Sequence, residues 1–251
     1  GLAVTICARD TAQIGVASNP LYTYQWDNTS SLTNANISNP KAFPLISTTY
    51  EVTTTEISTG CTATENVLVT VDPVPVSDFS VSSTCINEIA QFNDLTVIPS
   101  GSIAAWTWDF GDGIGASTLQ NPSYQYLATG TYSVKLVVES VLGCKDSITK
   151  NVTINPIPSV DFSFTSACLN QSTVFTDLSS IASGNSLQAW TWDFGDGVGN
   201  SMLQNPTYQY TAAGTYSVKL VVESSFGCKD SITKSVTIDP LPIVDFSFTS
   251  T

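Results

Sequence analysis

One stretch of eight residues occurs twice, and this repeat constrains the fold more than any other feature of the chain. Residues 106–113 and 190–197 both read Trp-Thr-Trp-Asp-Phe-Gly-Asp-Gly. The similarity extends far beyond them, because residues 105–154 and 189–238 differ at only 9 of 50 aligned positions. A fixed period of about 84 residues is typical of one structural unit copied in tandem. We therefore expect several small domains and not one large domain.

Each copy of the stretch alternates between aromatic and polar side chains, from Trp106 to Phe110 in the first copy. This period of two residues predicts a β-strand with one buried face. The Asp112-Gly113 pair that follows predicts a type I′ hairpin turn, whose two central residues both need positive φ. We interpret the tryptophans as core residues, and an exposed platform for sugar binding is the alternative.

Three blocks of sequence follow one another in the same order in both copies. They are Trp-Asp-Phe-Gly-Asp-Gly at 108–113, Asn-Pro-Ser-Tyr-Gln-Tyr at 121–126 and Gly-Thr-Tyr-Ser-Val-Lys-Leu at 130–136, and they recur with one change at 192–197, 205–210 and 214–220. This order resembles the PKD domain, an immunoglobulin-like β-sandwich of extracellular proteins. The resemblance implies an all-β chain without significant helix. It implies little about activity, because such domains serve as spacers in many surface proteins and secreted enzymes.

Alternating prolines divide the chain into modules. They lie at Pro73 and Pro75, at Pro156 and Pro158, and at Pro240 and Pro242. Because proline fixes φ and removes a hydrogen-bond donor, each pair ends one sheet and forms a short, stiff connection. We predict a divergent immunoglobulin-like domain at 1–72, PKD domains at 73–155 and 156–239, and a linker with an orphan first strand at 240–251. Three sandwiches joined in this way should form a rod.

The first module keeps the landmarks in order but differs in detail. Tyr22, Tyr24 and Trp26 alternate like the later tryptophan strands, and we interpret them as a core strand, with a carbohydrate platform as the alternative. The Gly-Asp-Gly turn is replaced by the sequence Asp-Asn-Thr-Ser at residues 27–30.

Composition narrows the classes of function. The chain has 8 basic and 21 acidic residues and a net charge of −13, which argues against binding to nucleic-acid phosphates and to anionic lipid. No apolar run is long enough for membrane insertion. Only 12% of the residues are charged, while Thr, Ser and Asn are abundant, as in the exposed strands of secreted β proteins. We expect an extracellular protein of the cell surface.

The six cysteines fit one disulfide per module. Sequential pairing joins Cys7 to Cys61, Cys85 to Cys144 and Cys168 to Cys228, with separations of 54, 59 and 60 residues. Fifteen connectivities are possible in principle, and the modular repetition favours this one. One disulfide in each module implies an oxidising, extracellular compartment.

No combination of residues indicates catalysis or a cofactor, so we do not expect an enzyme. The chain has no histidine, its cysteines are expected to be paired, and its carboxylates are scattered over strands and turns. The recurring acidic pairs, Asp109 with Asp112 and Asp193 with Asp196, are weak calcium candidates that lack the spacing of a calcium loop. We expect these aspartates to bond the backbone of their own turns, with no metal bound.

Three short segments resemble the Asp-Ser/Thr-aliphatic signal for O-glycosylation in surface proteins of some gliding bacteria. They are Asp-Thr-Ala at 10–12, Asp-Ser-Ile at 146–148 and Asp-Ser-Ile at 230–232. The resemblance makes Thr11, Ser147 and Ser231 candidates for glycan attachment, and a glycan a candidate partner.

The last residues repeat the opening strand of the third module. Residues 244–249 copy residues 160–165, so Val244, Phe246 and Phe248 share one face of a predicted strand. Two hypotheses follow. In the first, the chain is a section of a longer tandem array and neighbouring modules complete the strand. In the second, the strand pairs with the first module of another copy and joins chains head to tail.

The sequence as a whole predicts a structural protein, either an adhesin stalk or the repeating subunit of a cell-surface filament. Its partners would be copies of itself or neighbouring modules. An accessory carbohydrate-binding module of a secreted hydrolase is the alternative, and it predicts that Trp26, Trp106 and Trp108 form an exposed strip.

Overall fold

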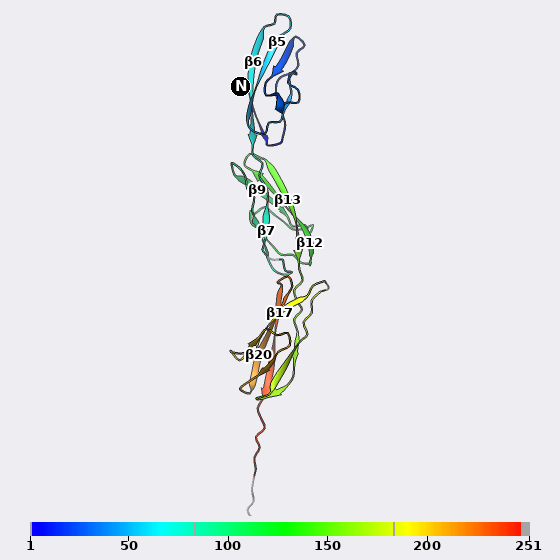
Figure 1. Ribbon diagram of the computed structural model, residues 1–251, viewed down its shortest axis with the longest axis vertical. Coiled ribbons are helices and arrows are strands. Elements are labelled where there is room, and N and C mark those ends of the chain that lie inside the picture. The colour runs from blue at the N-terminus through cyan, green and yellow to red at the C-terminus, as the bar shows by residue number, and fades with distance from the viewer. Residues whose placement is uncertain (1, 83, 183, 247–251) are drawn as a thin grey trace, which may run out of the picture. The chain divides into compact units, whose positions relative to one another are not determined.

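The computed structural model describes residues 2–82, 84–182 and 184–246, and Figure 1 shows its strands. Within these ranges the helices amount to one 3-10 turn, η1 (Thr29–Ser31), so the predicted all-β fold of tandem β-sandwiches is confirmed. The chain separates into two compact units. The first comprises Gly1–Val81, Gln91–Tyr124 and Ser133–Asn151, and the second Ser82–Ala90, Gln125–Tyr132 and Val152–Thr251. The module boundaries at the prolines stay a prediction, and "module" denotes below the sequence ranges 1–72, 73–155 and 156–239.

The first module contains six strands in two sheets. The strands are β1 (Leu2–Cys7), β2 (Ala12–Gln13), β3 (Tyr22–Trp26), β4 (Lys41–Ala42), β5 (Thr48–Glu56) and β6 (Thr62–Asp72). The larger sheet has the order β1-β6-β5-β3, with β5 and β6 side by side in Figure 1. Its edge strand β1 runs parallel to β6, whereas the other pairs are antiparallel. The smaller sheet pairs β2 with β4.

The core of the first module forms around Trp26 and Tyr50. Val67 and Val69 reach it from alternate positions of β6, as expected for a strand with one buried face. The indole N–H of Trp26 donates a hydrogen bond of 2.8 Å to the carbonyl of Ile37, so the polar edge of the ring is satisfied in the core.

The second module has seven strands. They are β7 (Phe79–Val81), β8 (Ala90–Asp94), β9 (Ile103–Asp109), β10 (Ala116–Ser117), β11 (Ser123–Tyr124), β12 (Gly130–Ser140) and β13 (Lys145–Ile154). They form sheets in the orders β10-β9-β12-β13 and β11-β8-β7.

The third module repeats this arrangement with an added strand, β15. Its strands are β14 (Phe162–Phe164), β15 (Ala167–Cys168), β16 (Ser172–Asp177), β17 (Leu187–Asp193), β18 (Asn200–Ser201), β19 (Thr207–Gln209), β20 (Gly214–Ser224) and β21 (Lys229–Asp239). The sheets have the orders β15-β21-β20-β17-β18 and β14-β16-β19. The register is also repeated, because Trp108 lies opposite Leu136 and Trp192 lies opposite Leu220.

The alternation read from the sequence is confirmed in the tryptophan strands. Trp108 and Phe110 are buried, while Thr107 and Asp109 are exposed. Trp106 lies on the same face as Trp108 but is only half-buried. The tryptophan strand therefore contributes one face to the core of its module.

The predicted type I′ turn at Asp112-Gly113 is wrong. Positive φ occurs at Gly111 (77°) and Gly113 (82°) but not at Asp112, and pairing resumes only where Ala116 of β10 meets Asp109. The loop is wider because the Asp112 carboxylate accepts hydrogen bonds from the backbone N–H groups that follow it. Gly111 is also required sterically, since a Cβ there would lie 2.6 Å from the Ser133 carbonyl oxygen.

Candidate functional site

The disulfides join cysteines of successive modules, so the predicted pairing within modules is wrong. Cys7 is bonded to Cys144, 137 residues away, and Cys85 is bonded to Cys228, 143 residues away. The predicted pairs Cys7 with Cys61, Cys85 with Cys144 and Cys168 with Cys228 do not form. Among the described residues, Cys61 and Cys168 are the unpaired cysteines.

The reason is that the segment carrying Cys7, Cys85 or Cys168 runs parallel to the last strand of its module. Cys7 lies opposite Asp72, the last residue of β6, whereas Cys61 directly precedes the first residue of that strand. Eleven residues of strand separate the two ends by roughly 35 Å. A disulfide needs Cα atoms about 4.4 to 6.8 Å apart, so Cys7 and Cys61 cannot bond. In both observed disulfides the distance is 5.6 Å.

The six cysteines thus fall into two structural classes. Each strand-end cysteine lies opposite the end of the last strand of its module, and each hairpin cysteine precedes the start of that strand. Both disulfides join a strand-end cysteine to the hairpin cysteine of the next module. The strand-end cysteines are Cys7, Cys85 and Cys168, and the hairpin cysteines are Cys61, Cys144 and Cys228.

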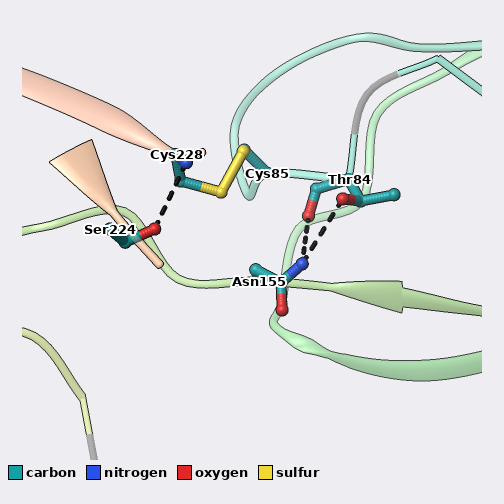
Figure 2. Close-up of a disulfide and its surroundings, with 5 residues drawn as sticks. All are labelled: Thr84, Cys85, Asn155, Ser224 and Cys228. Carbon is teal, nitrogen blue, oxygen red and sulfur yellow. Dashed lines mark hydrogen bonds between the residues drawn. A yellow bond between two sulfur atoms is a disulfide. The ribbon is translucent and has the colours of Figure 1, made fainter. Parts of the chain in front are cut away.

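Figure 2 shows the surroundings of the second disulfide. Cys228 is fully buried, and its N–H donates to the Ser224 hydroxyl at 3.2 Å. Beside Cys85, the side-chain amide of Asn155 donates to both the carbonyl and the hydroxyl of Thr84 at 3.3 Å. These bonds fix the backbone on both sides of the bridge.

A carboxylate near Cys144 fixes the start of the second module. Asp146 accepts hydrogen bonds from the N–H of Ser77 at 2.8 Å and from its hydroxyl at 2.7 Å. Burial opposes the ionised form of Asp146, but the bonds from Ser77 outweigh it, so the pKa of this carboxyl is lowered from 3.8. Asp146 is therefore a structural anion in the chain segment that carries the first disulfide.

The calcium candidates are engaged by their own loops. Asp109 accepts a bond of 2.9 Å from the N–H of Gly111, and Asp112 accepts bonds of 3.1 and 2.7 Å from the N–H groups of Ile114 and Gly115. Asp193 and Asp196 repeat these bonds in the third module. The expected bonding of turn aspartates to the backbone is confirmed. No cluster of three or more metal-ligating side chains occurs among the residues that the structure describes.

The tryptophans do not form an exposed strip. Trp26 is only 4% exposed and Trp108 is fully buried. The half-buried Trp106 donates its indole N–H to the Asp94 carboxylate at 2.7 Å, a bond that the third module repeats with Trp190 and Asp177. The interpretation of Trp26 and Trp108 as core residues is confirmed, and the alternative of an exposed strip for sugar stacking is wrong for these side chains.

The remaining sites named from the sequence lie on the surface where the structure describes them. Thr11, Ser147 and Ser231 are exposed, and their glycosylation stays a prediction. Val244 and Phe246 are 73% and 76% exposed and belong to no strand of the described residues. Phe248, the third residue of the predicted inter-subunit strand, lies outside the described residues.

The first module contains an apolar pocket that was not predicted from the sequence. It has a volume of about 120 Å³ and is lined in part by Gly15, Val16, Tyr24, Trp26, Val52 and Val67. A cavity of roughly 150 Å³ is large enough to hold a benzene ring.

In the other two modules a phenylalanine of the opening strand packs against the equivalent tryptophan. Phe79 of β7 lies edge-on to Trp108 with ring centroids 5.2 Å apart, and Phe162 of β14 lies 5.1 Å from Trp192. Trp26 is the counterpart of these tryptophans, because all three indoles donate to the carbonyl eleven residues further along the chain.

Two further residues that line the pocket, Val67 and Val16, also correspond to residues that surround the phenylalanine in the other modules. The amines of Lys150 and Lys234 lie 5.1 Å from the ring centroids of Phe79 and Phe162. Each lysine lies six residues after the hairpin cysteine of its module, and Val67 lies six residues after Cys61, so Val67 is their counterpart. Phe79 pairs with Asp94 and Phe162 pairs with Asp177.

These aspartates identify Val16 as the third matching residue. Asp94 and Asp177 each lie two residues after a phenylalanine whose N–H donates to the carbonyl of the proline in the Asn-Pro motif. In the first module, Ile14 donates the equivalent bond to the carbonyl of Pro40. Val16 follows Ile14 by two residues and lines the pocket. The pocket therefore lies where the other modules hold the phenylalanine of their opening strand.

Comparison with known proteins is consistent with this architecture. The family model "PKD domain" matches residues 70–156 and again residues 155–239. Collagenase ColA of Bacillus cereus is 35% identical over 80 residues, which are 32% of this chain and only 8% of the collagenase. In the described part of the chain, no helix has the length and apolar character to cross a bilayer.

Two of the similar solved structures are single domains of bacterial proteins. The PKD1 domain of Vibrio anguillarum Epp is 24% identical with a TM-score of 0.31, covering 33% of this chain and 95% of that domain. The PKD1 domain of the Vibrio cholerae metalloprotease PrtV is 27% identical with a TM-score of 0.30, covering 32% of this chain and 96% of that domain.

Proposed function

The chain belongs to the PKD-domain family, and on this premise we propose that it is the repeating subunit of an extracellular filament, joined head to tail through its terminal strand. PKD domains are non-catalytic modules, and together with the disulfides they indicate an extracellular protein. A structural role agrees with the non-catalytic character of PKD domains.

The single observation that carries the proposal is the match between the first-module pocket and the tail, residues 240–251. Residues 244–249 copy the sequence of residues 160–165, so Phe246 corresponds to Phe162. Phe162 is only 1% exposed in its own module, whereas Phe246 is exposed. A tail strand that enters the first module of another copy would bury Phe246 against Trp26, as Phe162 is buried against Trp192.

The strand arrangement supports the same docking. The sheets β11-β8-β7 and β14-β16-β19 each contain three strands, while the corresponding sheet of the first module contains β2 and β4 among the described residues. The additional strand in the other modules is the opening strand, which pairs with β8 or β16. A donated tail would supply this third strand and cover the outer edge of β2.

An adhesin stalk is the second candidate, and the disulfides between successive modules are equally compatible with it. Such bridges hold neighbouring modules together against extension in a stalk as well as in a filament. In a stalk, another part of the same polypeptide would fill the first-module pocket. The two candidates therefore differ in whether the isolated chain assembles.

Light scattering after size-exclusion chromatography tests the proposal with complementary variants, all carrying Cys61→Ser and Cys168→Ser to exclude new disulfides. Phe246→Asp removes the donor, and Val16→Arg, at an exposed position of the pocket rim, blocks the acceptor. We expect the parent to form concentration-dependent oligomers and each variant to be monomeric. An equimolar mixture of the two variants should form dimers and nothing larger.

The matched control is Leu127→Asp, which charges an equally exposed apolar residue outside the tail and the pocket. It should assemble like the parent. A parent that stays monomeric at millimolar concentration would contradict the filament and leave the stalk, and oligomers of Phe246→Asp alone would contradict docking through the tail.

A further inference from the structure

Cys61 has a backbone setting similar to that of the two hairpin cysteines that form disulfides, in a loop that is one residue longer. The carbonyl oxygens of Cys61, Cys144 and Cys228 accept bonds of 2.9, 2.9 and 2.8 Å from the N–H of the residue that ends the preceding strand. A glycine with positive φ precedes each cysteine, with values of 74°, 85° and 80°. The N–H of Cys61 donates to the hydroxyl of Thr59, as the other two donate to a serine hydroxyl.

Cys168 likewise has the setting of the two bonded strand-end cysteines. The residue after Cys7, Cys85 and Cys168 donates its N–H to the end of the last strand, at 2.8, 2.9 and 2.8 Å. The second residue after each cysteine has positive φ, with values of 78°, 65° and 67°. The third donates its N–H back to the cysteine carbonyl. The backbone thus presents Cys168 as it presents the two bonded cysteines of its class.

The two unpaired cysteines are of opposite class and lie in the modules at the two ends of the series. Each existing disulfide joins a strand-end cysteine to the hairpin cysteine of the following module. By the same pattern, Cys168 of the third module would bond to the hairpin cysteine of a module that follows it. In the head-to-tail arrangement, the following module is the first module of the next copy, whose hairpin cysteine is Cys61.

We propose that Cys168 of one copy forms a disulfide with Cys61 of the next copy, so that the filament is covalently continuous. This inference rests on the proposed function, because tail donation sets the same order: the third module of one copy precedes the first module of the next. The thiols are available for the reaction, since Cys61 is exposed and Cys168 is partly exposed.

The bond forms by thiol–disulfide exchange with a disulfide oxidant. The thiolate of Cys168 attacks a sulfur of the oxidant, forms a mixed disulfide and releases one reduced thiol. The thiolate of Cys61 then attacks the Cys168 sulfur, which forms the protein–protein disulfide and releases the second thiol. The two protein thiols lose two protons and two electrons, and the oxidant gains them as two S–H groups. Oxidised glutathione serves as the oxidant in vitro.

Non-reducing gel electrophoresis after incubation with oxidised glutathione tests the inference on the full chain. We expect a ladder of covalent multimers from the parent, monomers from Cys61→Ser alone and from Cys168→Ser alone, and one dimer band from their equimolar mixture. Mass spectrometry of that dimer should find the peptide of Cys61 joined to the peptide of Cys168. Both variants keep the two existing disulfides, so they retain the parent fold.

Tail docking should raise the rate of the reaction, because it converts a bimolecular encounter into one at high effective concentration. In the parent background, Phe246→Asp should therefore slow the ladder by at least about tenfold. Multimers that form without any Cys61–Cys168 peptide would overturn the covalent link while leaving the filament intact. Dimers of Cys61→Ser alone or of Cys168→Ser alone would also overturn it, since they join cysteines of the same class.

Discussion

The carboxylates of Asp112 and Asp196 organise the loop after each tryptophan strand. In both modules one carboxylate oxygen accepts two backbone N–H bonds, and the other accepts the hydroxyl of a tyrosine, Tyr124 or Tyr208. Burial opposes ionisation of Asp196, but these bonds outweigh it and lower the pKa of the carboxyl from 3.8. The hydrogen bond to Asp196, followed by burial, raises the pKa of Tyr208 to about 12.

These pKa shifts predict that the folded state of the third module loses stability both in acid and in alkali. Because the folded pKa of Asp196 is lowered, its stabilisation is complete above 3.8 and is lost as the pH falls through the folded value. Because the folded pKa of Tyr208 is raised from 10.0, its stabilisation is complete below 10.0 and is lost as the pH rises through about 12.

Urea unfolding of Asp196→Asn checks the acidic limb. At pH 7 the variant should be less stable by about 1 to 3 kcal/mol, because it loses bonds to a charged acceptor. The difference from the parent should shrink as the pH falls below 3.8. Asp230→Asn, which removes an exposed carboxylate that accepts, among the described residues, a bond only from the N–H of the adjacent Ser231, is the control for the loss of one surface charge at pH 7 and should change the stability little. A difference for Asp196→Asn that is equal at pH 2 and pH 7 would contradict this assignment.

At the scale of elements, the opening strand occurs in two settings. β7 and β14 are folded into their own modules, whereas the tail, which copies residues 160–165 around β14, pairs with no strand among the described residues. Burial of one aromatic ring, Phe79 or Phe162, accounts for much of what the strand contributes to the core.

Equivalent substitutions in β14 and in the tail should have different effects on stability and assembly. Phe162→Ala should lower the free energy of unfolding of its module by about 3 to 5 kcal/mol, because it leaves a cavity beside Trp192. Phe246→Ala should leave the thermal unfolding of the monomer unchanged and weaken assembly instead. Calorimetry of dilute monomer, together with light scattering, measures both effects. A destabilised Phe246→Ala monomer would mean that the tail docks within its own chain.

Long strands were predictable from the sequence and short ones were not. β12 spans Gly130–Ser140, and the alternation of its sequence matches the alternation of exposed and buried side chains along the strand. Two-residue strands such as β10 and β15 are too short for any alternation. Their pairing depends on neighbours that are distant in the sequence, as the parallel pairing of β15 with β21 illustrates.

The same limitation explains the error in the disulfides and the missed pocket. Spacings of similar length suggested one bridge per module, but Cys7 lies at the far end of β6 from Cys61 because β1 is parallel to β6. The pocket was not predictable, because it depends on which side chains surround the place of the opening strand. The sequence did contain the copied tail, and with it the head-to-tail hypothesis.

At the scale of the whole molecule, the two disulfides overlap along the chain. One spans residues 7 to 144 and the other spans 85 to 228, so each closes a loop that contains one end of the other. In the loop-entropy model, a loop of this length restricts the unfolded chain by about 5 kcal/mol. Under tension, the shortest covalent path from Cys7 to Cys228 crosses both bridges and runs back along residues 144 to 85.

This topology gives a mechanical prediction that is not additive. With both bridges intact, about 60 residues can extend between Cys7 and Cys228, or roughly 200 Å. With one bridge removed, about 80 residues can extend, or roughly 270 Å, and with both removed about 220 residues, or roughly 750 Å. Either disulfide alone therefore prevents most of the extension, a property that the proposed filament subunit would need under tension.

Single-molecule force spectroscopy of the chain held at its two ends measures these lengths directly. We predict that Cys7→Ser and Cys85→Ser each add less than about 100 Å to the unfolded length and that the double variant adds roughly 550 Å. Bridges confined to single modules would instead make each substitution add roughly 180 Å, with the two increments summing in the double variant. Additive increments of that size would contradict disulfides between successive modules, and with them the account of this chain as a covalently linked, load-bearing array.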